Sequence, residues 1–418
     1  MSTVPDAARP RVLMVTGAYA PETSGASLQC RNLIRALRDR ADFMVLTTST
    51  DPALPWNSKV DDIHVRRVPV DPSSVISKAI AIERMASSFF ELASSFDIVH
   101  LHGFSQKSIL IVALARLLGK KIVIKLTSLG HDDPAAIRAQ GRAMWTAYRQ
   151  ADRYIGVTPR FADGFAAAGL DPRRFVFIPN GVDLDRFKPA SADTRAEFQN
   201  LLRIPIGDPV VLFVGFFSRE KNPDVLFEAW LDLHERGVRS TLVLIGATRG
   251  TYYEIDAGLA ERIKEKATRR GVIDRVVFVE AAEHISHYFR AADVFALPTA
   301  REGLPNVLLE AMASSVPPVI TRLEGVTDWI VESGVTGELV PSADAKAFAV
   351  PIERLLTSRE QREAMGAAAR AHVAAHFSMT ATAQKTFELY QDLLADPQPP
   401  RASHASSGPA NPGPPAAG

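Results

Sequence analysis

The sequence has only one cysteine, Cys30, in 418 residues. A single cysteine excludes an internal disulfide bond and fits a reducing compartment, so we expect a cytoplasmic protein. Long apolar runs are also missing. No stretch approaches the roughly 18 consecutive apolar residues of a membrane span. The apolar run near the N-terminus, "VLMV", is too short for a signal peptide.

Clustered charge and two common ligand motifs are absent as well. The net charge is +1 and no dense run of lysine and arginine occurs, which argues against nucleic acid as a partner. The first strand candidate is not followed by GxGxxG, so a nicotinamide dinucleotide is not predicted. No cluster of Asp and His side chains has the spacing of metal ligands, so we expect neither a bound metal nor another cofactor.

What the chain does contain is a regular alternation of strand and helix patterns. Hydrophobic residues make up 46% of the chain, enough for more than one core. Continuous apolar strands separated by helices predict parallel sheets covered on both faces. The strand candidates are 11–16, 43–48, 63–70, 97–103, 121–127, 153–158 and 175–180, followed by a second series at 210–215, 241–246, 275–280, 293–299 and 317–321.

Two series of strands predict an α/β protein with two doubly wound domains. A polar, proline-marked stretch near 185–208 separates them, and we expect the domains to be 1–190 and 191–375. We expect helix 376–395 to pack back on the first domain, and the Pro/Ala/Gly/Ser-rich tail 396–418 to be disordered. Ligands of open parallel sheets bind beyond the carboxyl ends of the strands, so the cleft between the domains is the expected site.

Two carboxylates stand seven residues apart after the strand at 293–299, in "REGLPNVLLEAMA". Glu302 lies in the loop, and Glu310 lies in the helix that follows. Pro305 suits the first helical turn, whose free amides form an anion site for a diphosphate. The two carboxylates could bind the hexose and the ribose of one nucleotide-sugar. Alternatively, Glu310 is a partly exposed surface residue and Glu302 an ordinary loop charge.

A basic pair, Arg219 and Lys221, occupies the corresponding loop after the strand at 210–215. Cations there can neutralise a diphosphate leaving group, on which charge develops as a glycosyl bond breaks. The alternative is a pair of solvated loop charges. The parallel position of Glu302 favours the phosphate interpretation.

The first half of the chain gives weaker signals. Gly25, near the start of the first helix, would let the backbone approach a ligand closely. His102 stands near the carboxyl end of its strand and is equally compatible with the cleft and with the core. Thr127, His131 and Asp132 follow the next strand and could also reach the cleft; the alternative is that Asp132 or Asp133 caps the helix that begins near Pro134.

The dipeptide Asn180-Gly181 closes the first series of strands. Asn-Gly is a strong turn signal, so we expect Gly181 at positive φ. We interpret this turn as structural and adjacent to the hinge between the domains.

Four segments together resemble the retaining glycosyltransferases of glycosyltransferase family 4. They are "PNGVDLDRFKP", "VLFVGFFSREKNPDVLFEAW", "AADVFALPTAREGLPNVLLEAMASSVPPVI" and "GVTDWIVESGVTGELVP". The resemblance spans roughly residues 11–395 and implies the GT-B fold, in which two Rossmann-like domains face each other across a cleft. It also implies that Glu302 contacts the donor sugar and Glu310 the ribose. The diphosphate would bind between them at the helix start, which is formed by Gly303, Leu304, Pro305 and Asn306.

The phosphate clamp departs from the family pattern. Family members often carry an arginine shortly after the strand-end glycine, here Gly215, but this chain has Phe216. Lys221 matches the family's lysine. Either Arg219 substitutes from a shifted loop or the clamp is weaker. His131 is the best candidate for the histidine that is common in the family's catalytic site, although its loop is not of the usual form.

By resemblance, the reaction moves a sugar, with retention, from a UDP- or GDP-linked donor to a hydroxyl group without a metal. The acceptor could be a glycan, a lipid-linked saccharide or a small molecule. A nucleotide-sugar epimerase of the same architecture and a non-catalytic binding module are the alternatives. The acceptor, the donor base and the oligomeric state stay open.

Residues 74–96 carry apolar side chains at helical spacing. The simpler interpretation is a helix packed on the first sheet. The alternative is an interfacial helix that holds the protein at the inner face of the membrane and reaches lipid-linked acceptors.

Overall fold

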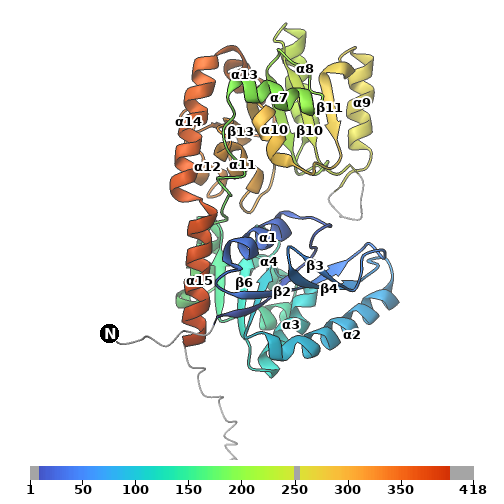
Figure 1. Ribbon diagram of the computed structural model, residues 1–418, viewed down its shortest axis with the longest axis vertical. Helices are drawn as coiled ribbons and strands as arrows, with labels where there is room; N and C mark the ends of the chain where they lie inside the picture. The colour runs from blue at the N-terminus through green and yellow to red at the C-terminus, as the bar shows by residue number, and fades with distance from the viewer. Residues whose placement is uncertain (1–8, 249–254, 396–418) are drawn as a thin grey trace, which may run out of the picture.

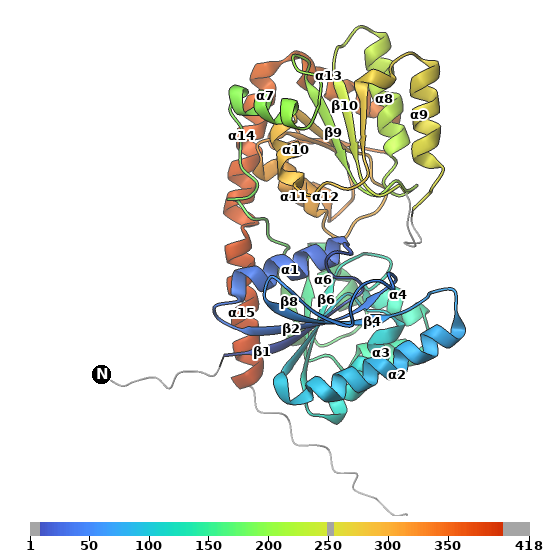
Figure 2. The ribbon, with the colours of Figure 1, turned by 45° about the vertical axis from the view of Figure 1, so that its right-hand side comes forward.

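The structure is a computed structural model that describes residues 9–248 and 255–395. The tail predicted to be disordered, 396–418, lies outside these residues. Figures 1 and 2 show two lobes stacked along the long axis of the molecule, with α14 and α15 running along one side. Each lobe is built on one sheet, so the protein has the expected α/β architecture of two parallel-sheet domains.

The first lobe contains the sheet β3-β4-β2-β1-β5-β6-β7-β8. All its neighbouring strands are parallel except β3 and β4, which pair antiparallel at the edge. Its strands are β1 (Arg11–Thr16), β2 (Asp42–Ser49), β3 (Asn57–Val60), β4 (Ile63–Pro69), β5 (Ile98–His102), β6 (Lys121–Leu126), β7 (Arg153–Gly156) and β8 (Phe175–Phe177).

Helices cover both faces of this sheet. Val12 and Met14 of β1 share a core with α1 and α15, whereas Leu13 and Val15 share one with α2 and α3, because successive side chains of a strand point to opposite faces. The helices and 3₁₀ turns (η) of this lobe are α1 (Gly25–Leu37), α2 (Val75–Leu92), η1 (Ala93–Ser95), α3 (Gln106–Leu117), α4 (Pro134–Ala139), α5 (Arg142–Tyr148), α6 (Pro159–Ala167) and η2 (Pro172–Arg174).

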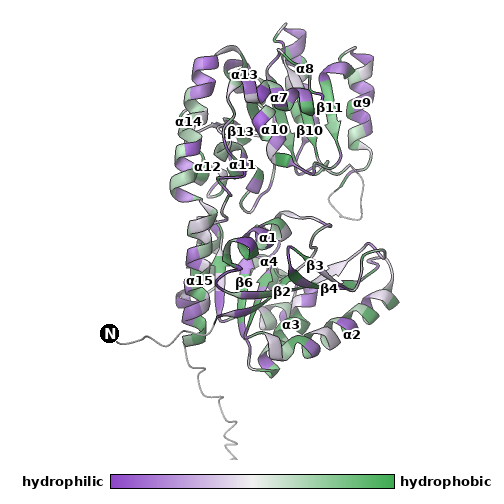
Figure 3. Cartoon of the chain, viewed as in Figure 1, coloured by the Kyte–Doolittle hydropathy of each residue, from purple (hydrophilic) through white to green (hydrophobic). Residues whose placement is uncertain are grey.

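The second lobe contains the all-parallel sheet β11-β10-β9-β12-β13-β14. Figure 3 shows apolar residues along its strands β10 and β11. Its strands are β9 (Val210–Val214), β10 (Thr241–Ile245), β11 (Val276–Val279), β12 (Val294–Leu297), β13 (Pro318–Thr321) and β14 (Glu338–Val340). Its helices are α7 (Ala192–Leu201), α8 (Pro223–Glu235), α9 (Leu259–Arg269), η3 (Ile273–Arg275), α10 (Ile285–Ala291), α11 (Asn306–Ala313), α12 (Thr327–Ile330), α13 (Ala345–Thr357) and α14 (Arg359–His376).

The chain passes between the lobes twice, and the two crossings are joined. The backbone N–H of Val182 donates to Phe377 O at 2.8 Å, and that of Met379 donates to Val182 O at 2.9 Å. After the second crossing, α15 (Met379–Ala395) packs beside α1, and the Tyr390 hydroxyl lies 2.6 Å from Nδ1 of His100 on β5. We propose that the first domain comprises 1–190 together with the helix at 376–395.

Two strands were not anticipated. The segment of β3 is polar and half exposed, and β14 has only three residues, so neither has an apolar run long enough to stand out. Gly181 also differs from expectation, because its φ is not positive. A Cβ there would lie 2.6 Å from Cα of Met379, so the glycine permits close packing of α15.

Helix α2 buries one face and exposes another. Ala81, Met85 and Phe89 pack on the first sheet, as the simpler interpretation requires. Val75 and Ile76, however, are 79% and 74% exposed, and Ile80, Ile82 and Phe90 are exposed as well. Across residues 9–248 and 255–395, no helix combines the length and the apolar character needed to cross a membrane.

Candidate functional site

Lys221 and Glu302 meet at the carboxyl ends of two neighbouring strands. Lys221 follows β9 and Glu302 follows β12, and these strands pair in the second sheet. Lys221 Nζ lies 2.5 Å from Glu302 Oε1, with the two side chains 17% and 11% exposed. The sequence therefore identified two side chains that the fold joins in one largely buried ion pair.

The two loops that carry this pair are tied together. The backbone N–H of Ala300 donates to Glu220 O at 2.7 Å, and the Asn222 side-chain amide donates to Pro298 O at 2.8 Å. Arg301 forms an ion pair with Glu220 at 2.7 Å. These bonds fix the relative position of Lys221 and Glu302 before any ligand binds.

Gly215 lies between the Phe213 ring and the stem of Lys221. A Cβ on Gly215 would lie 3.1 Å from the Phe213 ring and 3.6 Å from Cγ of Lys221. Its N–H donates to Ile245 O of the neighbouring strand at 2.9 Å. A larger residue would therefore crowd the Phe213 ring, which lies beneath the loop that carries Lys221.

The start of α11 reaches across to the first lobe. The helix begins at Asn306, so Pro305 is its N-cap rather than a residue of the first turn. The Asn306 amide donates to Gly25 O at 3.0 Å, and its side-chain oxygen accepts from Asn180 Nδ2 at 2.9 Å. Leu304 and Pro305 are buried beside it. One side chain thus links the predicted anion site to the start of α1 and to the segment of Asn180 in the other lobe.

Gly303 makes a close contact between the lobes. It forms an isolated antiparallel bridge with Ser128, which follows β6. A Cβ on Gly303 would lie 2.0 Å from the carbonyl oxygen of Thr127, so only glycine fits. Thr127 therefore reaches the predicted site, through its backbone.

Asp132 holds the loop that makes this contact. Its carboxylate accepts from the Thr127 N–H at 2.8 Å, the Thr127 hydroxyl at 2.7 Å and the Ser128 N–H at 2.9 Å. Burial raises the pKa of Asp132 to about 6, although these hydrogen bonds partly offset that effect. Asp133 instead caps α4 by accepting from the N–H groups of Ala135 and Ala136.

Glu310 stands on α11 without a polar partner. Burial raises the pKa of its carboxyl to about 7, and the positive charge of Arg186 offsets this only in part. Within the described ranges, no hydrogen bond or ion pair reaches this carboxylate. A desolvated carboxylate without donors is unfavourable, and ligand hydroxyl groups would satisfy it.

Three other predicted residues have different surroundings. Arg219 is exposed. Its positive charge adds to the lowering of the pKa of Asp256, which is due mainly to a hydrogen bond from Arg262. His131 is exposed on the loop that Asp132 holds, with its backbone N–H bonded to Ser128 O. Of the two interpretations of His102, the cleft is wrong: the residue is 6% exposed, and the centre of its ring lies 4.5 Å from that of His100.

The burial of His102 has a simple cause. His100 and His102 are two residues apart on β5 and therefore share the face covered by α1 and α15. Burial lowers the pKa of His102 well below its usual value, so the ring is neutral. It is a core histidine.

Sequence reasoning did not assign Asn180 to the site. Asn180 was interpreted as part of a turn, and its bond to Asn306 joins segments 126 residues apart. In the part of the chain that the structure describes, no three His, Cys, Asp or Glu side chains are grouped so that they could hold a metal ion.

Two family patterns match the chain. The pattern described as "Glycosyl transferases group 1" matches residues 194–372, and "Glycosyl transferase 4-like domain" matches residues 24–181. The boundary between these matches falls where the chain first crosses between the lobes.

This chain is also similar to curated proteins and to a solved structure. A D-inositol 3-phosphate glycosyltransferase of Salinispora arenicola is 30% identical over 362 residues, covering 80% of this chain and 79% of the relative. The enzyme of the same name from Corynebacterium urealyticum is 33% identical over 240 residues, which is 57% of this chain and only 56% of that protein. Anabaena HepE, solved with UDP and glucose, has a TM-score of 0.74 at 19% identity, covering 91% of this chain and 99% of HepE.

Proposed function

Since the chain belongs to the group 1 glycosyl transferases, we propose that it moves a sugar, with retention, from a UDP-sugar to a hydroxyl group of an acceptor. The ion pair of Lys221 and Glu302 at the start of α11 is the observation that carries this proposal. The similarity to HepE, whose structures contain UDP and UDP-glucose, supports UDP over GDP as the donor nucleotide.

Lys221 would stabilise the departing diphosphate. The bond between the sugar C1 and the phosphate oxygen breaks, and negative charge develops on that oxygen. An ammonium group has three N–H donors, so Lys221 can keep its bond to Glu302 and donate to the phosphate as well. The free amides at the start of α11 add to this stabilisation.

The acceptor oxygen would bond to C1 on the face that the diphosphate leaves. Its proton passes to the departing phosphate oxygen, so the step needs no protein base. Glu302 would accept hydrogen bonds from sugar hydroxyls and hold C1 near both oxygens. Arg219 would add charge to the phosphate site only if its exposed side chain turns inward on binding.

The acceptor would bind on the side of the first lobe, beside the loop of Thr127 and His131. We propose a phosphorylated polyol, because the relatives are named for inositol 3-phosphate. The contact between Gly303 and Thr127 supports this location, since it brings the loop against the donor side of the site. His131 lies on the same loop and is our candidate for contact with the acceptor.

The titration of Glu310 predicts how nucleotide binding depends on pH. With a pKa of about 7, the carboxyl loses its proton between about pH 6 and pH 8. The ionised form accepts ribose hydroxyls best, so UDP affinity should fall as the pH drops below 7, by up to about tenfold per unit. Calorimetric titration of UDP across this range is the measurement, and Glu310→Gln should give a flatter profile.

The same pKa has the opposite effect on the stability of the unliganded protein. A carboxyl with a raised folded pKa stabilises the fold fully below its unfolded pKa and loses that contribution as the pH rises through about 7. Melting curves without UDP should therefore show this loss in the wild type and not in Glu310→Gln. An identical UDP profile in both proteins would exclude Glu310 from the nucleotide site.

The proposal as a whole is tested by nucleotide binding and then by product analysis. We expect UDP to stabilise the protein against unfolding more than GDP or ADP, with and without magnesium; saturation at 100 times the Kd adds about 2.7 kcal/mol. Incubation with UDP-glucose and inositol 3-phosphate should then yield a glycosylated acceptor. A new UDP-sugar formed without acceptor would indicate an epimerase, and binding without turnover would indicate a non-catalytic module.

The exposed side of α2 favours a second candidate, a lipid-linked acceptor at a membrane surface. Val75, Ile76 and Ile80 lie exposed within one and a half turns, beside the basic Lys78. We expect the protein to float with vesicles that contain anionic lipid, and Ile76→Glu/Ile80→Glu to reduce the floating fraction about tenfold. Ile206→Glu, at an exposed position of the second lobe, is the matched control. If the wild-type protein stays at the bottom of the gradient and does not float with the vesicles, a lipid-linked acceptor at the membrane is excluded.

A further inference from the structure

The first lobe has a pocket of about 370 Å³ at the end opposite the Lys221–Glu302 pair. It lies between α5 and the segment that follows α6. Arg149 and Tyr154, which line it, stand at the amino end of β7, whereas Thr127 and Gly303 meet beyond the carboxyl end of β6. Because these strands are parallel, the pocket is at the far edge of the sheet from the proposed transfer site.

Three guanidinium groups line this pocket, those of Arg138, Arg149 and Arg174. Arg174 Nη1 donates to the carbonyl oxygens of Arg149 and Ala151 at 3.2 and 3.4 Å, so these bonds leave its charge uncompensated. Arg138 lies over the ring of Trp145, 4.8 Å from its centre. Among the described residues, none of the three forms an ion pair with a carboxylate.

The single acidic side chain among the lining residues is already neutralised. Asp171 accepts from Arg173 Nε at 3.1 Å and Nη2 at 2.9 Å, and these bonds lower the pKa of its carboxyl. Arg173 points its charge at Asp171 and is not a lining residue. The pocket therefore presents net positive charge.

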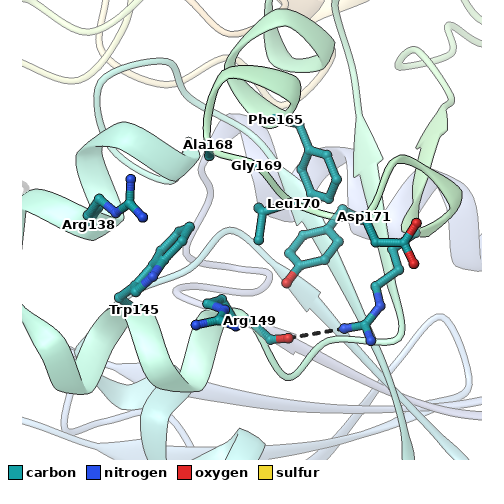
Figure 4. A pocket seen from close by; sticks show the side chains of 10 residues that line it. Arg138, Trp145, Arg149, Phe165, Ala168, Gly169, Leu170 and Asp171 are labelled. Atoms are coloured by element: carbon teal, nitrogen blue, oxygen red, sulfur yellow. Dashed lines mark hydrogen bonds between the residues drawn. The ribbon is translucent and has the colours of Figure 1, made fainter.

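The other walls are apolar and aromatic. Figure 4 shows Trp145 on one side of the pocket, below Arg138, and Phe165 and Leu170 on the other side. Phe165 is buried, while Trp145 and Leu170 are half exposed and face the open space. A volume of this size is at the lower end of the range for small-molecule sites.

We propose that this pocket binds a phosphorylated small molecule, with its phosphate held by Arg138, Arg149 and Arg174 and its ring against Trp145 and Leu170. Guanidinium groups match phosphate oxygens in geometry as well as in charge. A sugar phosphate and a nucleoside monophosphate share this chemistry. The site is additional to the donor and acceptor sites, which lie at the other end of the sheet.

The test is calorimetric titration with inorganic pyrophosphate, glucose 1-phosphate and AMP. We use the Lys221→Ala variant as background, so that binding at the proposed transfer site is weakened. Arg138→Gln/Arg149→Gln on that background should lower the affinity for the best probe at least about tenfold, or 1.4 kcal/mol. The probe that binds more tightly, glucose 1-phosphate or AMP, identifies the source of the phosphate.

Arg142→Gln is the matched control. Arg142 is an exposed arginine at the start of α5, the helix that ends just before Arg149, and it does not line the pocket. Its loss removes one of the nearby positive charges, where the double variant removes two, and should leave binding unchanged. Arg138 and Arg149 are exposed, so the double variant should melt at the same temperature as its parent. The proposal is overturned if no probe binds saturably at millimolar concentration, or if the double variant and the Arg142→Gln control bind equally well.

Discussion

Replacing Lys221 with alanine is expected to lower the turnover number about 100-fold. Lys221 is held against Glu302, in the loop that leads into α11, and removing one group that stabilises developing charge typically has an effect of this size. The change also leaves Glu302, whose side chain is only 11% exposed, without its partner. The unpaired carboxylate would then repel the diphosphate that the site must bind.

The measurement is steady-state transfer from the UDP-sugar, with UDP affinity followed separately. Lys221→Arg keeps the charge and should recover part of the activity. Lys264→Ala is the control, because it breaks an exposed ion pair with Glu261 in the same lobe and should leave turnover unchanged. Unchanged turnover in both Lys221→Ala and Glu302→Gln would show that the ion pair is not the site of transfer.

Gly303→Ala is expected to lower transfer by a similar factor while UDP still binds. The new Cβ would lie 2.0 Å from the carbonyl oxygen of Thr127 and 2.7 Å from its carbonyl carbon. Both are backbone atoms, so they cannot rotate away, and the two lobes must separate. A misplacement of about 1 Å between reacting groups can reduce a rate about 100-fold.

The second lobe itself should tolerate this alanine. Gly303 does not have a positive φ, and the three nearest atoms to its Cβ position all belong to the first lobe. The nucleotide affinity should therefore stay within about twofold, in contrast to Lys221→Ala. Gly164→Ala is the matched control, since the nearest atom to its Cβ position is 4.0 Å away. Full transfer activity in Gly303→Ala would mean that the reaction does not need this contact.

The sequence was most informative where neighbouring elements decide the structure. Lys221 and Glu302 were predicted to be close because each follows a strand in a series of parallel strands, and the carboxyl ends of such strands share one edge. The apolar strands were found for the same reason, since burial on both faces leaves a continuous run. The short polar strand β3 had no such signal.

The sequence was least informative where segments far away along the chain determine the surroundings of a residue. The spacing of His100 and His102 shows that they share a face, but that face is covered by α15, almost 290 residues later, through Tyr390. The dipeptide Asn180-Gly181 predicted a turn with positive φ, whereas Gly181 instead permits close packing against Met379. Local patterns carry no information about such partners.

The position of α15 has a consequence for the order in which the protein is completed. The strands of the first lobe are the first to leave the ribosome, and domains generally fold in that order. Yet Val12 and Met14 share their core with Phe387 and Tyr390, which are synthesised after every strand of the second lobe. The first lobe, although it is translated first, therefore completes its core last. Until α15 has been synthesised, part of that apolar core is exposed on the nascent chain.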